Sequence, residues 1–335
     1  MKPKVVITGG CSYSQFKNAD ETWPKFLIDT LEPDKLGILG QGAAGNEYIS
    51  RSVISTVQLA LDEGHKPEEI LVGVVWSGCD RQLYYSDDDS TLHRAHVQPM
   101  TGWEEFIQNN LHYLNSFPHV GKMITFEDYQ GRFSSGSNPH SSSPMTIRNS
   151  KNMGFYTLNS HWEDELTVGY YSKYINPVYA IMQTCEHILR TQWFLKSHNI
   201  PYFMSEYDFD VFTYMGPNNL NIYPNLNERA GISVLKTEAW DCETSSIEKD
   251  QARKFIEDKH KEEMLTKDMH PEVSYLYDMI DKDHWLPVRD LKNWTREESP
   301  YEQRDPNDPH PSSEQQEDFT KRVILPFILE KYNIS

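Results

Sequence analysis

The chain has 335 residues, of which 32 are Lys or Arg and 50 are Asp or Glu, giving a formal net charge of −18. This length is enough to bury a large core, and a composition with 12% aromatic and 24% charged residues is typical of a globular protein and excludes a disordered one. The acidic excess and the lack of a cationic cluster argue against a protein that binds nucleic acid.

The cysteines and the N-terminal segment indicate the compartment. The four cysteines are far apart and form no CxxC pair, so the sequence predicts neither a disulfide framework nor a cysteine zinc site. We find no signal peptide and no run of about 18 apolar residues that would span a membrane. A cytoplasmic protein with reduced thiols and no membrane association is therefore expected.

The N-terminal part of the chain alternates short strands and helices. β-Branched runs ended by glycine predict buried parallel strands, and apolar residues at helical spacing predict the helices between them. The predicted elements are a strand at Lys4 to Thr8, a helix from Trp23, a strand at Gly37 to Leu39, a helix ending at Gly64 and a strand at Ile70 to Trp76. This βαβαβ order predicts a parallel sheet with helices on both faces.

Two polar segments interrupt the pattern. Residues 86–165 have few periodic stretches, and we interpret them as an insertion, a lid or a contact surface. A helix over 178–189 and a strand at 200–204 follow. Residues 209–280 form the second segment, and the alternating charges of its helix candidate at 246–266 are typical of a solvated face.

The last forty residues predict a loop followed by a closing helix. Residues 305–311 are rich in Asp and Pro, and His310 lies in this stretch. A capping box at Ser312 with Gln315 predicts the start of a helix that runs to about Tyr332, with a bend at Pro326. His310 is thus placed directly before the final helix.

A serine follows the first predicted strand in the segment Gly9-Gly10-Cys11-Ser12-Tyr13-Ser14. The carboxyl edge of an open parallel sheet is where ligands gather, and backbone N–H groups at a helix start favour developing negative charge there. Taken alone, the segment is better explained as an ordinary strand-to-helix turn.

The wider pattern resembles the SGNH (GDSL-type) hydrolase superfamily. GGCSYS at the first strand, the turn GQGAAGN, the strand and turn WSGCDR, and PHPS before the last helix follow one another in the order of that family's blocks. Short GCS forms followed by a Trp-Pro helix are similar to versions encoded by tailed bacteriophages. The resemblance covers roughly positions 4–85, 175–207 and 300–332 and leaves both polar segments unexplained.

The resemblance implies a role for three residues. Ser12 matches the nucleophile, and its own N–H would be one donor of the oxyanion hole. Gly45, which we prefer to Gly42 because Asn46 follows it and opens a helix, would supply the next N–H. His310 matches the general base that takes the serine proton and returns it to the leaving group.

This sequence also departs from the family. Cys11 stands where most members have aspartate. The third block has no asparagine, so Ser77 is our candidate for the third oxyanion donor, with Cys79 nearer the register but a poor donor. Loss of one such donor costs about 2.7–4 kcal/mol of transition-state stabilisation in a well-studied hydrolase.

The acid that orients His310 is not fixed by the motif either. Asn307 stands three residues before the histidine, where the family has aspartate. Asp308 is our choice, and Asp305 stays an alternative. A serine and histidine pair without a good acid is a known working arrangement that is slower.

Other side chains compete for these roles. His270 and His284 are rivals for the base. Asp281 and His284 have the family's Asp-x-x-His spacing, but about fifty residues follow them, so we place His310 first. Arg81 is a candidate contact for an anionic or sugar substrate, and a surface ion pair is its alternative. His93 and His96 have a metal-ligand spacing that nothing nearby completes, so they are interpreted as surface residues.

We therefore predict a single domain over residues 1–335, a three-layer α/β/α sandwich of flavodoxin-like SGNH type with insertions at about 86–165 and 209–280. The predicted function is a serine esterase that removes O-acyl groups from a carbohydrate or similar ester, without metal or cofactor. An O-acyltransferase and a catalytically weakened phage structural or carbohydrate-binding protein are the alternatives.

The aromatic side chains bear on the substrate. The 19 Tyr and 8 Trp suit sugar stacking, although most are better explained as members of small hydrophobic cores under the long loops. Expected partners are the ester substrate and, through the insertions, a phage particle or further copies of the chain.

Overall fold

A computed structural model describes residues 2–15, 21–40, 44–79, 81–86, 123–134, 154–159, 177–208, 271–288, 290–303 and 310–334. Its strands are β1 (Val5–Gly10), β2 (Lys35–Ile38), β3 (Ile70–Trp76), β4 (Arg81–Ser86), β5 (Ile124–Thr125), β6 (Gly154–Asn159) and β7 (Tyr202–Glu206). Its longer helices are α1 (Trp23–Leu31), α2 (Asn46–Asp62), α5 (Phe126–Ser134), α7 (Pro177–Ser197), α11 (Pro271–Asp278), α12 (Leu291–Glu297), α13 (Ser313–Phe319) and α14 (Leu325–Tyr332). Its shorter helical turns are η1 (Ser12–Ser14), η2 (Pro67–Glu69), η4 (Lys282–His284) and η5 (Thr320–Ile324).

Within these ranges, the main sheet has five strands in the order β5-β2-β1-β3-β7. β1 pairs in parallel with β2 and β3, and β3 pairs in parallel with β7, whereas β5 lies antiparallel on the edge beside β2. On the outer side of β7, Trp285 forms a single parallel bridge with Met204. The protein is thus of the α/β class, with a mostly parallel sheet at its centre.

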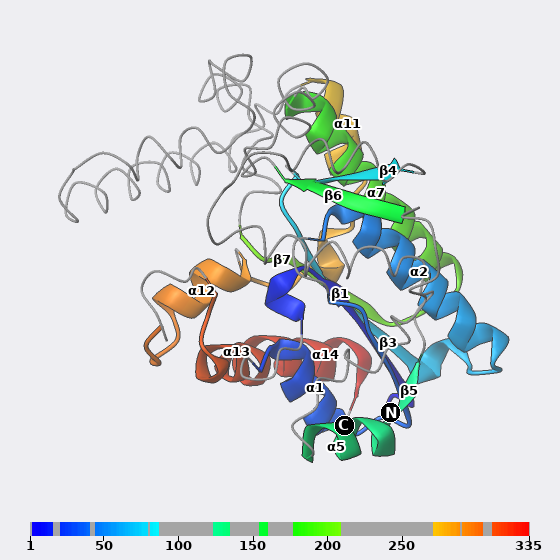
Figure 1. The fold of residues 1–335 in the computed structure, drawn as a ribbon, viewed down its shortest axis with the longest axis vertical. Helices are drawn as coiled ribbons and strands as arrows, with labels where there is room; N and C mark the ends of the chain where they lie inside the picture. The colour runs from blue at the N-terminus through cyan, green and yellow to red at the C-terminus, as the bar shows by residue number, and fades with distance from the viewer. Residues whose placement is uncertain are drawn as a thin grey trace.

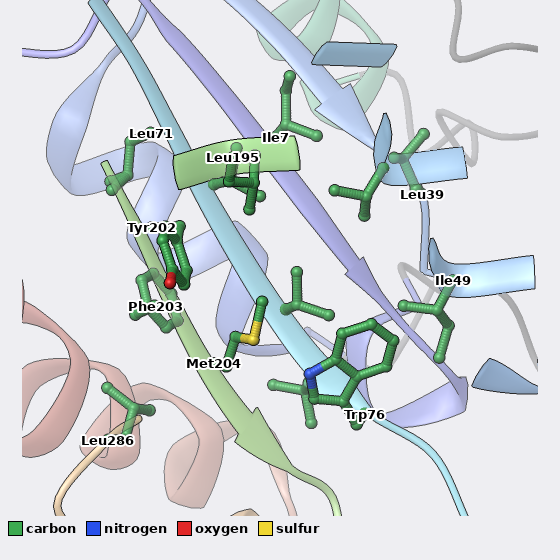
Figure 2. Packing of buried hydrophobic residues seen from close by; sticks show 14 of the residues in the cluster. Ile7, Leu39, Ile49, Leu71, Trp76, Leu195, Tyr202, Phe203, Met204 and Leu286 are labelled. Atoms are coloured by element: carbon green, nitrogen blue, oxygen red, sulfur yellow. The ribbon is translucent and has the colours of Figure 1, made fainter. Parts of the chain in front are cut away.

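Helices cover both faces of this sheet. α2 and α7 lie on one face, and α1, α13 and α14 lie on the other (Figure 1). Because both faces are covered, every residue of β1 and β3 is buried, which explains their continuous runs of apolar side chains. Ile7, Leu71 and Phe203 are among the core residues contributed by β1, β3 and β7 (Figure 2).

The predicted elements of the first eighty residues are confirmed, with small changes at their ends. The two glycines expected to end the first strand are its last residues, since β1 runs to Gly10. α1 begins at Trp23, α2 ends shortly before Gly64, and the central strand has the predicted bounds. Gly64 has a φ of 88°, a left-handed conformation that suits glycine at the end of a helix.

Part of the first polar segment belongs to the main sheet. β5 pairs with β2, and Tyr129 on α5 is 1% exposed and donates a hydrogen bond to Asp29 of α1 at 2.9 Å. β4 and β6 pair as a separate two-stranded antiparallel sheet. Residues 86–165 thus contain regular elements, β5, α5 and β6, that their few periodic stretches do not predict, while their interpretation as an insertion, a lid or a contact surface stays a prediction. Two-residue strands such as β5 carry no periodic signal.

The second polar segment lies mostly outside the described residues, including the charge-rich helix candidate at 246–266. Its last part forms α11, which packs on α7. No helix in the described parts of the chain is long and apolar enough to cross a bilayer.

The closing helix begins where the sequence predicts but differs in its middle. Ser312 is the N-cap of α13 and forms the expected capping box with Gln315. Instead of a simple bend at Pro326, the five residues of η5 form a π-helical turn between α13 and α14. Proline has no N–H and its ring crowds the preceding turn, so a wider turn directly before Pro326 relieves the conflict.

Gly73 offers a direct test of packing between the sheet and α1. A Cβ atom at this position would lie 2.4 Å from Cζ of Phe203 and 3.0 Å from Cη2 of Trp23, and both rings are fully buried. We expect Gly73→Ala to lower the free energy of unfolding by about 1–3 kcal/mol, because neither ring has room to move. Urea denaturation measures this, and a change under about 0.5 kcal/mol, the size of an ordinary surface substitution, would contradict it.

Candidate active site

Ser12 and His310 meet at the carboxyl edge of the sheet. Nε2 of His310 lies 2.7 Å from Oγ of Ser12, a hydrogen-bond distance, although 298 residues separate them in the sequence. Both residues are partly exposed. A hydroxyl group hydrogen-bonded to an imidazole is the arrangement from which a base removes the proton of a nucleophile.

The local turn explains why Ser12 projects from the strand end. β1 ends at Gly10, and the next residues form the single 3-10 turn η1, in which Ser14 N–H donates to the carbonyl of Cys11 at 2.9 Å. The Ser14 hydroxyl oxygen accepts a hydrogen bond from Nε1 of Trp23 at 2.9 Å. Cys11, Tyr13 and Ser14 are all buried, which leaves Ser12 as the residue of this turn that faces outward.

Helix α13 holds the histidine beside this turn. Ser312, two residues after His310, caps the helix. Gln316 bridges to the other end of the chain: its Oε1 accepts from Trp23 N–H at 3.1 Å, and its Nε2 lies 3.5 Å from the carbonyl oxygen of Tyr13. Gln315 donates to the carbonyl of Thr295 at 2.8 Å, which fixes α13 to α12. The loop with His310 is thus attached to a helix that contacts the turn with Ser12 directly.

The imidazole of His310 is the first of three rings that, with a guanidinium group, form a stack. The ring of Tyr13 lies 4.6 Å from the imidazole of His310 and 4.8 Å from the ring of Tyr207. The guanidinium carbon of Arg81 lies 5.2 Å from the centre of the Tyr207 ring. Burial, together with the nearby carboxylate of Asp208, raises the pKa of Tyr13 well above its ordinary value. Tyr13 is therefore a neutral phenol throughout the working pH range.

The end of β7 is fixed by a buried ion pair. Asp208 is 2% exposed and pairs with Lys292 of α12. The backbone N–H of Lys292 also donates to the carbonyl of Tyr207 at 2.9 Å. These contacts hold Tyr207, and with it the outer part of the stack, against the sheet edge.

A second group of residues joins the turns after β2 and β3. The Asn46 side chain accepts from Ser77 N–H and donates to the Ser77 carbonyl, each at 2.8 Å. Arg81 donates to the hydroxyl oxygen of Ser77 at 2.8 Å. A Cβ atom on Gly45 would lie 2.5 Å from the carbonyl oxygen of Arg81, so only glycine allows this close approach. Gly45, Asn46, Ser77 and Arg81 therefore form one packed cluster.

The structure brings the predicted site residues together in two groups. Ser12 and His310 form the first, and Gly45, Ser77 and Arg81 belong to the second, with Tyr13 and Tyr207 between them. Ser77 is fully buried, and its contacts hold Arg81 and the turn; its role as an oxyanion donor stays a prediction. Cys79 is buried. Asp308, Asp305 and Gly42 lie outside the described residues.

The rival histidine lies elsewhere. Nδ1 of His284 lies 2.9 Å from Oδ2 of Asp281, as its Asp-x-x-His spacing suggests, and its ring stacks on Tyr202 at 4.2 Å. Tyr202 is the first residue of β7, so this pair is toward the amino end of the strand, whereas Ser12 follows the carboxyl end of β1. His270, His93 and His96 lie outside the described residues.

Sequence reasoning missed several residues that build the site. Tyr13, Tyr207 and Gln316 make their contacts across most of the chain, and no local spacing points to them. From the sequence, Asn46 is only the residue that opens a helix. An amide directly after a glycine turn and ahead of an apolar helix is a signal that could have suggested hydrogen bonds between its side chain and a neighbouring turn.

No group of three or more His, Cys, Asp or Glu side chains that could hold a metal ion occurs among the residues that the structure describes. Comparisons of the chain with models of protein families, with curated proteins and with solved structures give no match.

Proposed function

We propose that this protein is a serine esterase of SGNH type, in which Ser12 is the nucleophile and His310 the general base. The observation that carries the proposal is the 2.7 Å contact between Ser12 Oγ and His310 Nε2 at the carboxyl edge of a parallel sheet. The order of the parallel strands, β2-β1-β3-β7, agrees with the flavodoxin-like order expected from the resemblance.

The proposed reaction has two halves. Ser12 Oγ attacks the ester carbonyl carbon while His310 takes the hydroxyl proton, and the tetrahedral intermediate then collapses with cleavage of the bond to the alcohol, which receives the proton from His310. Water next attacks the acyl-serine, His310 takes one of its protons, and the released Ser12 oxygen receives it back. The products are the free alcohol and a carboxylic acid, and neither step needs a cofactor.

The oxyanion would be held by backbone N–H groups. Ser12 supplies its own N–H from the turn η1, and Gly45 at the N-cap of α2 supplies the second. Ser77 is the third candidate. A site with two firm donors instead of three is expected to be slower by about 10²–10³-fold, the usual cost of losing one donor.

The substrate class follows from the resemblance and from the aromatic residues of the chain. An O-acyl group, such as acetyl, on a carbohydrate is the proposed ester, with Arg81 as a contact for a sugar or an anionic group. An acyltransferase would use the same residues and pass the acyl group to a sugar hydroxyl instead of water, so an acceptor-dependence assay separates the two.

One observation favours the alternative of a weakened, structural or carbohydrate-binding protein. The third block has no asparagine, and in Ser77, our candidate for its role, the N–H donates to Asn46 and the hydroxyl oxygen accepts from Arg81. Association with a phage particle belongs to this alternative.

Covalent labelling with a fluorophosphonate tests the proposal. We expect the wild-type protein to be modified at Ser12, Ser12→Ala to be unmodified, and His310→Ala to react about 10²–10⁴-fold more slowly, because a general base contributes a factor of that size. Peptide mapping by mass spectrometry locates the adduct.

Ser197→Ala is the matched control. Ser197 also has its hydroxyl group beside a histidine, with Oγ 3.1 Å from Nδ1 of His198, but the pair lies at the exposed end of α7. Labelling of this variant should equal that of the wild type. A folded wild-type protein that takes up no label at Ser12 would overturn the esterase proposal and favour the structural alternative.

A further inference from the structure

The turn that carries the candidate nucleophile also carries a buried aromatic ring. Tyr13 follows Ser12 directly, is 2% exposed, and its ring lies 4.6 Å from the imidazole of His310 with 33° between the ring planes. The distance and angle describe two rings in tilted face contact. Ser12 and Tyr13 thus touch the same imidazole from one three-residue turn.

The two contacts restrain different motions of the imidazole. The hydrogen bond between Nε2 and Ser12 Oγ fixes one atom of the ring, but the ring can still turn about that bond, and the terminal torsion of a histidine side chain is broad. A flat ring packed on the imidazole face opposes this rotation. The pair of contacts therefore sets both the position of Nε2 and the plane of its lone pair.

Tyr13 is itself held on several sides. Its carbonyl oxygen lies 3.5 Å from Nε2 of Gln316, and the ring of Tyr207 packs 4.8 Å away at an interplanar angle of 47°. Arg81 lies over Tyr207 in turn. Because Tyr13 cannot move away from His310 without displacing this stack, its ring is a rigid support.

We infer that Tyr13 is a positioning residue for His310: its ring holds the imidazole in the plane in which Nε2 accepts the Ser12 proton. This inference rests on the proposed function for its kinetic consequence. The ring is the part that acts, and the phenol oxygen is not required.

Three variants separate the effect of the Tyr13 ring from that of its hydroxyl group and from that of losing a buried aromatic side chain. Tyr13→Phe keeps the ring, Tyr13→Leu keeps an apolar side chain without a flat face, and Tyr202→Leu is the matched control. Tyr202 is 1% exposed and also stacks on a histidine, His284, at 4.2 Å, but toward the amino end of β7. Its loss should affect folding in the same way without reaching Ser12.

The measurement is fluorophosphonate labelling at Ser12, resolved into the affinity for the probe and the rate of the covalent step. We expect the covalent step to be within about threefold of wild type in Tyr13→Phe and Tyr202→Leu, and to fall about 10–100-fold in Tyr13→Leu with the affinity little changed, because a misplacement of about 1 Å costs rates of that order. Wild-type rates in Tyr13→Leu would overturn the inference.

A second measurement does not depend on reactivity. The imidazole protons of His310, assigned by comparison with His310→Ala, should show ring-current shifts in NMR spectra of wild type and Tyr13→Phe. These shifts should be lost in Tyr13→Leu and reduced in Tyr207→Leu, which keeps the Tyr13 ring but removes the ring that supports it. Unchanged shifts would overturn the inference.

The two proposals fail differently. Absence of label at Ser12 in the wild type overturns the esterase proposal, while the NMR comparison still decides whether Tyr13 positions the imidazole. Equal labelling of wild type and Tyr13→Leu overturns only the role of Tyr13.

Discussion

Replacement of His310 by alanine should lower kcat for hydrolysis of an activated acetyl ester by about 10²–10⁴-fold, while KM changes little. The imidazole is the group that contacts the Ser12 hydroxyl, so its loss leaves the nucleophile protonated without removing contacts to the acyl group. Ser12→Ala should lose at least as much. Steady-state hydrolysis of an aryl acetate, with protein concentration measured by absorbance, gives both constants.

His284→Ala is the control for a general effect of removing a histidine. His284 also contacts an aspartate and a tyrosine ring, but beside the first residue of β7. Its kcat should stay near that of the wild type, within about the factor of two that an ordinary substitution away from the site causes. A loss in His284→Ala as large as that in His310→Ala would contradict the assignment of the base.

The same assay decides which acid orients the base. Asp308 is our choice and Asp305 the alternative, so Asp308→Asn should lower kcat more than Asp305→Asn. A carboxylate that orients a catalytic imidazole also stabilises the imidazolium, and its amide replacement has cost about 10⁴-fold in a well-known triad. A larger loss in Asp305→Asn would reverse the choice.

Asn46→Ala should lower the free energy of unfolding by about 2–5 kcal/mol. The substitution leaves both the N–H and the carbonyl group of Ser77 without the amide that now pairs with them, and Ser77 is fully buried. Each unsatisfied buried group costs about 1–3 kcal/mol. Chemical denaturation followed by circular dichroism measures the change, and an unchanged m-value shows that it reflects stability.

Asn46→Asp is the matched control for this prediction. The aspartate has the same size and keeps an oxygen that accepts from Ser77 N–H, but it cannot donate to the Ser77 carbonyl. Its cost should therefore come from the carbonyl alone and from the buried charge. A cost for Asn46→Ala below about 1 kcal/mol, the value of one ordinary hydrogen bond, would show that the two hydrogen bonds between Asn46 and Ser77 are not needed for stability.

The strands and helices that are buried on a regular pattern could be predicted from the sequence. Ile70 to Trp76 is a continuous apolar run, and α2 repeats apolar residues at helical spacing, so the sequence of each element predicts that it is buried. β5 could not be predicted in this way. It has two residues, and its strand character comes from pairing with β2, about ninety residues earlier in the chain.

The site shows the same division. Ser12 and His310 stand in short motifs at an element boundary, which a pattern can reveal, whereas the ring of Tyr207 joins the site only because β7 ends beside η1. Contacts of this kind depend on the completed packing of the sheet. A sequence pattern therefore points to Ser12 and His310, but it does not reveal the residues that support them.

The distance in sequence between Ser12 and His310 has a consequence for biosynthesis. A ribosome adds about 5–20 residues per second, so roughly 15–60 s pass between the synthesis of the two residues. During this interval the emerging serine has no imidazole beside it and remains an ordinary alcohol. Under the proposed function, reactivity at Ser12 would begin only when α13 folds against α1, and a nascent or prematurely terminated chain would be inert toward acyl groups.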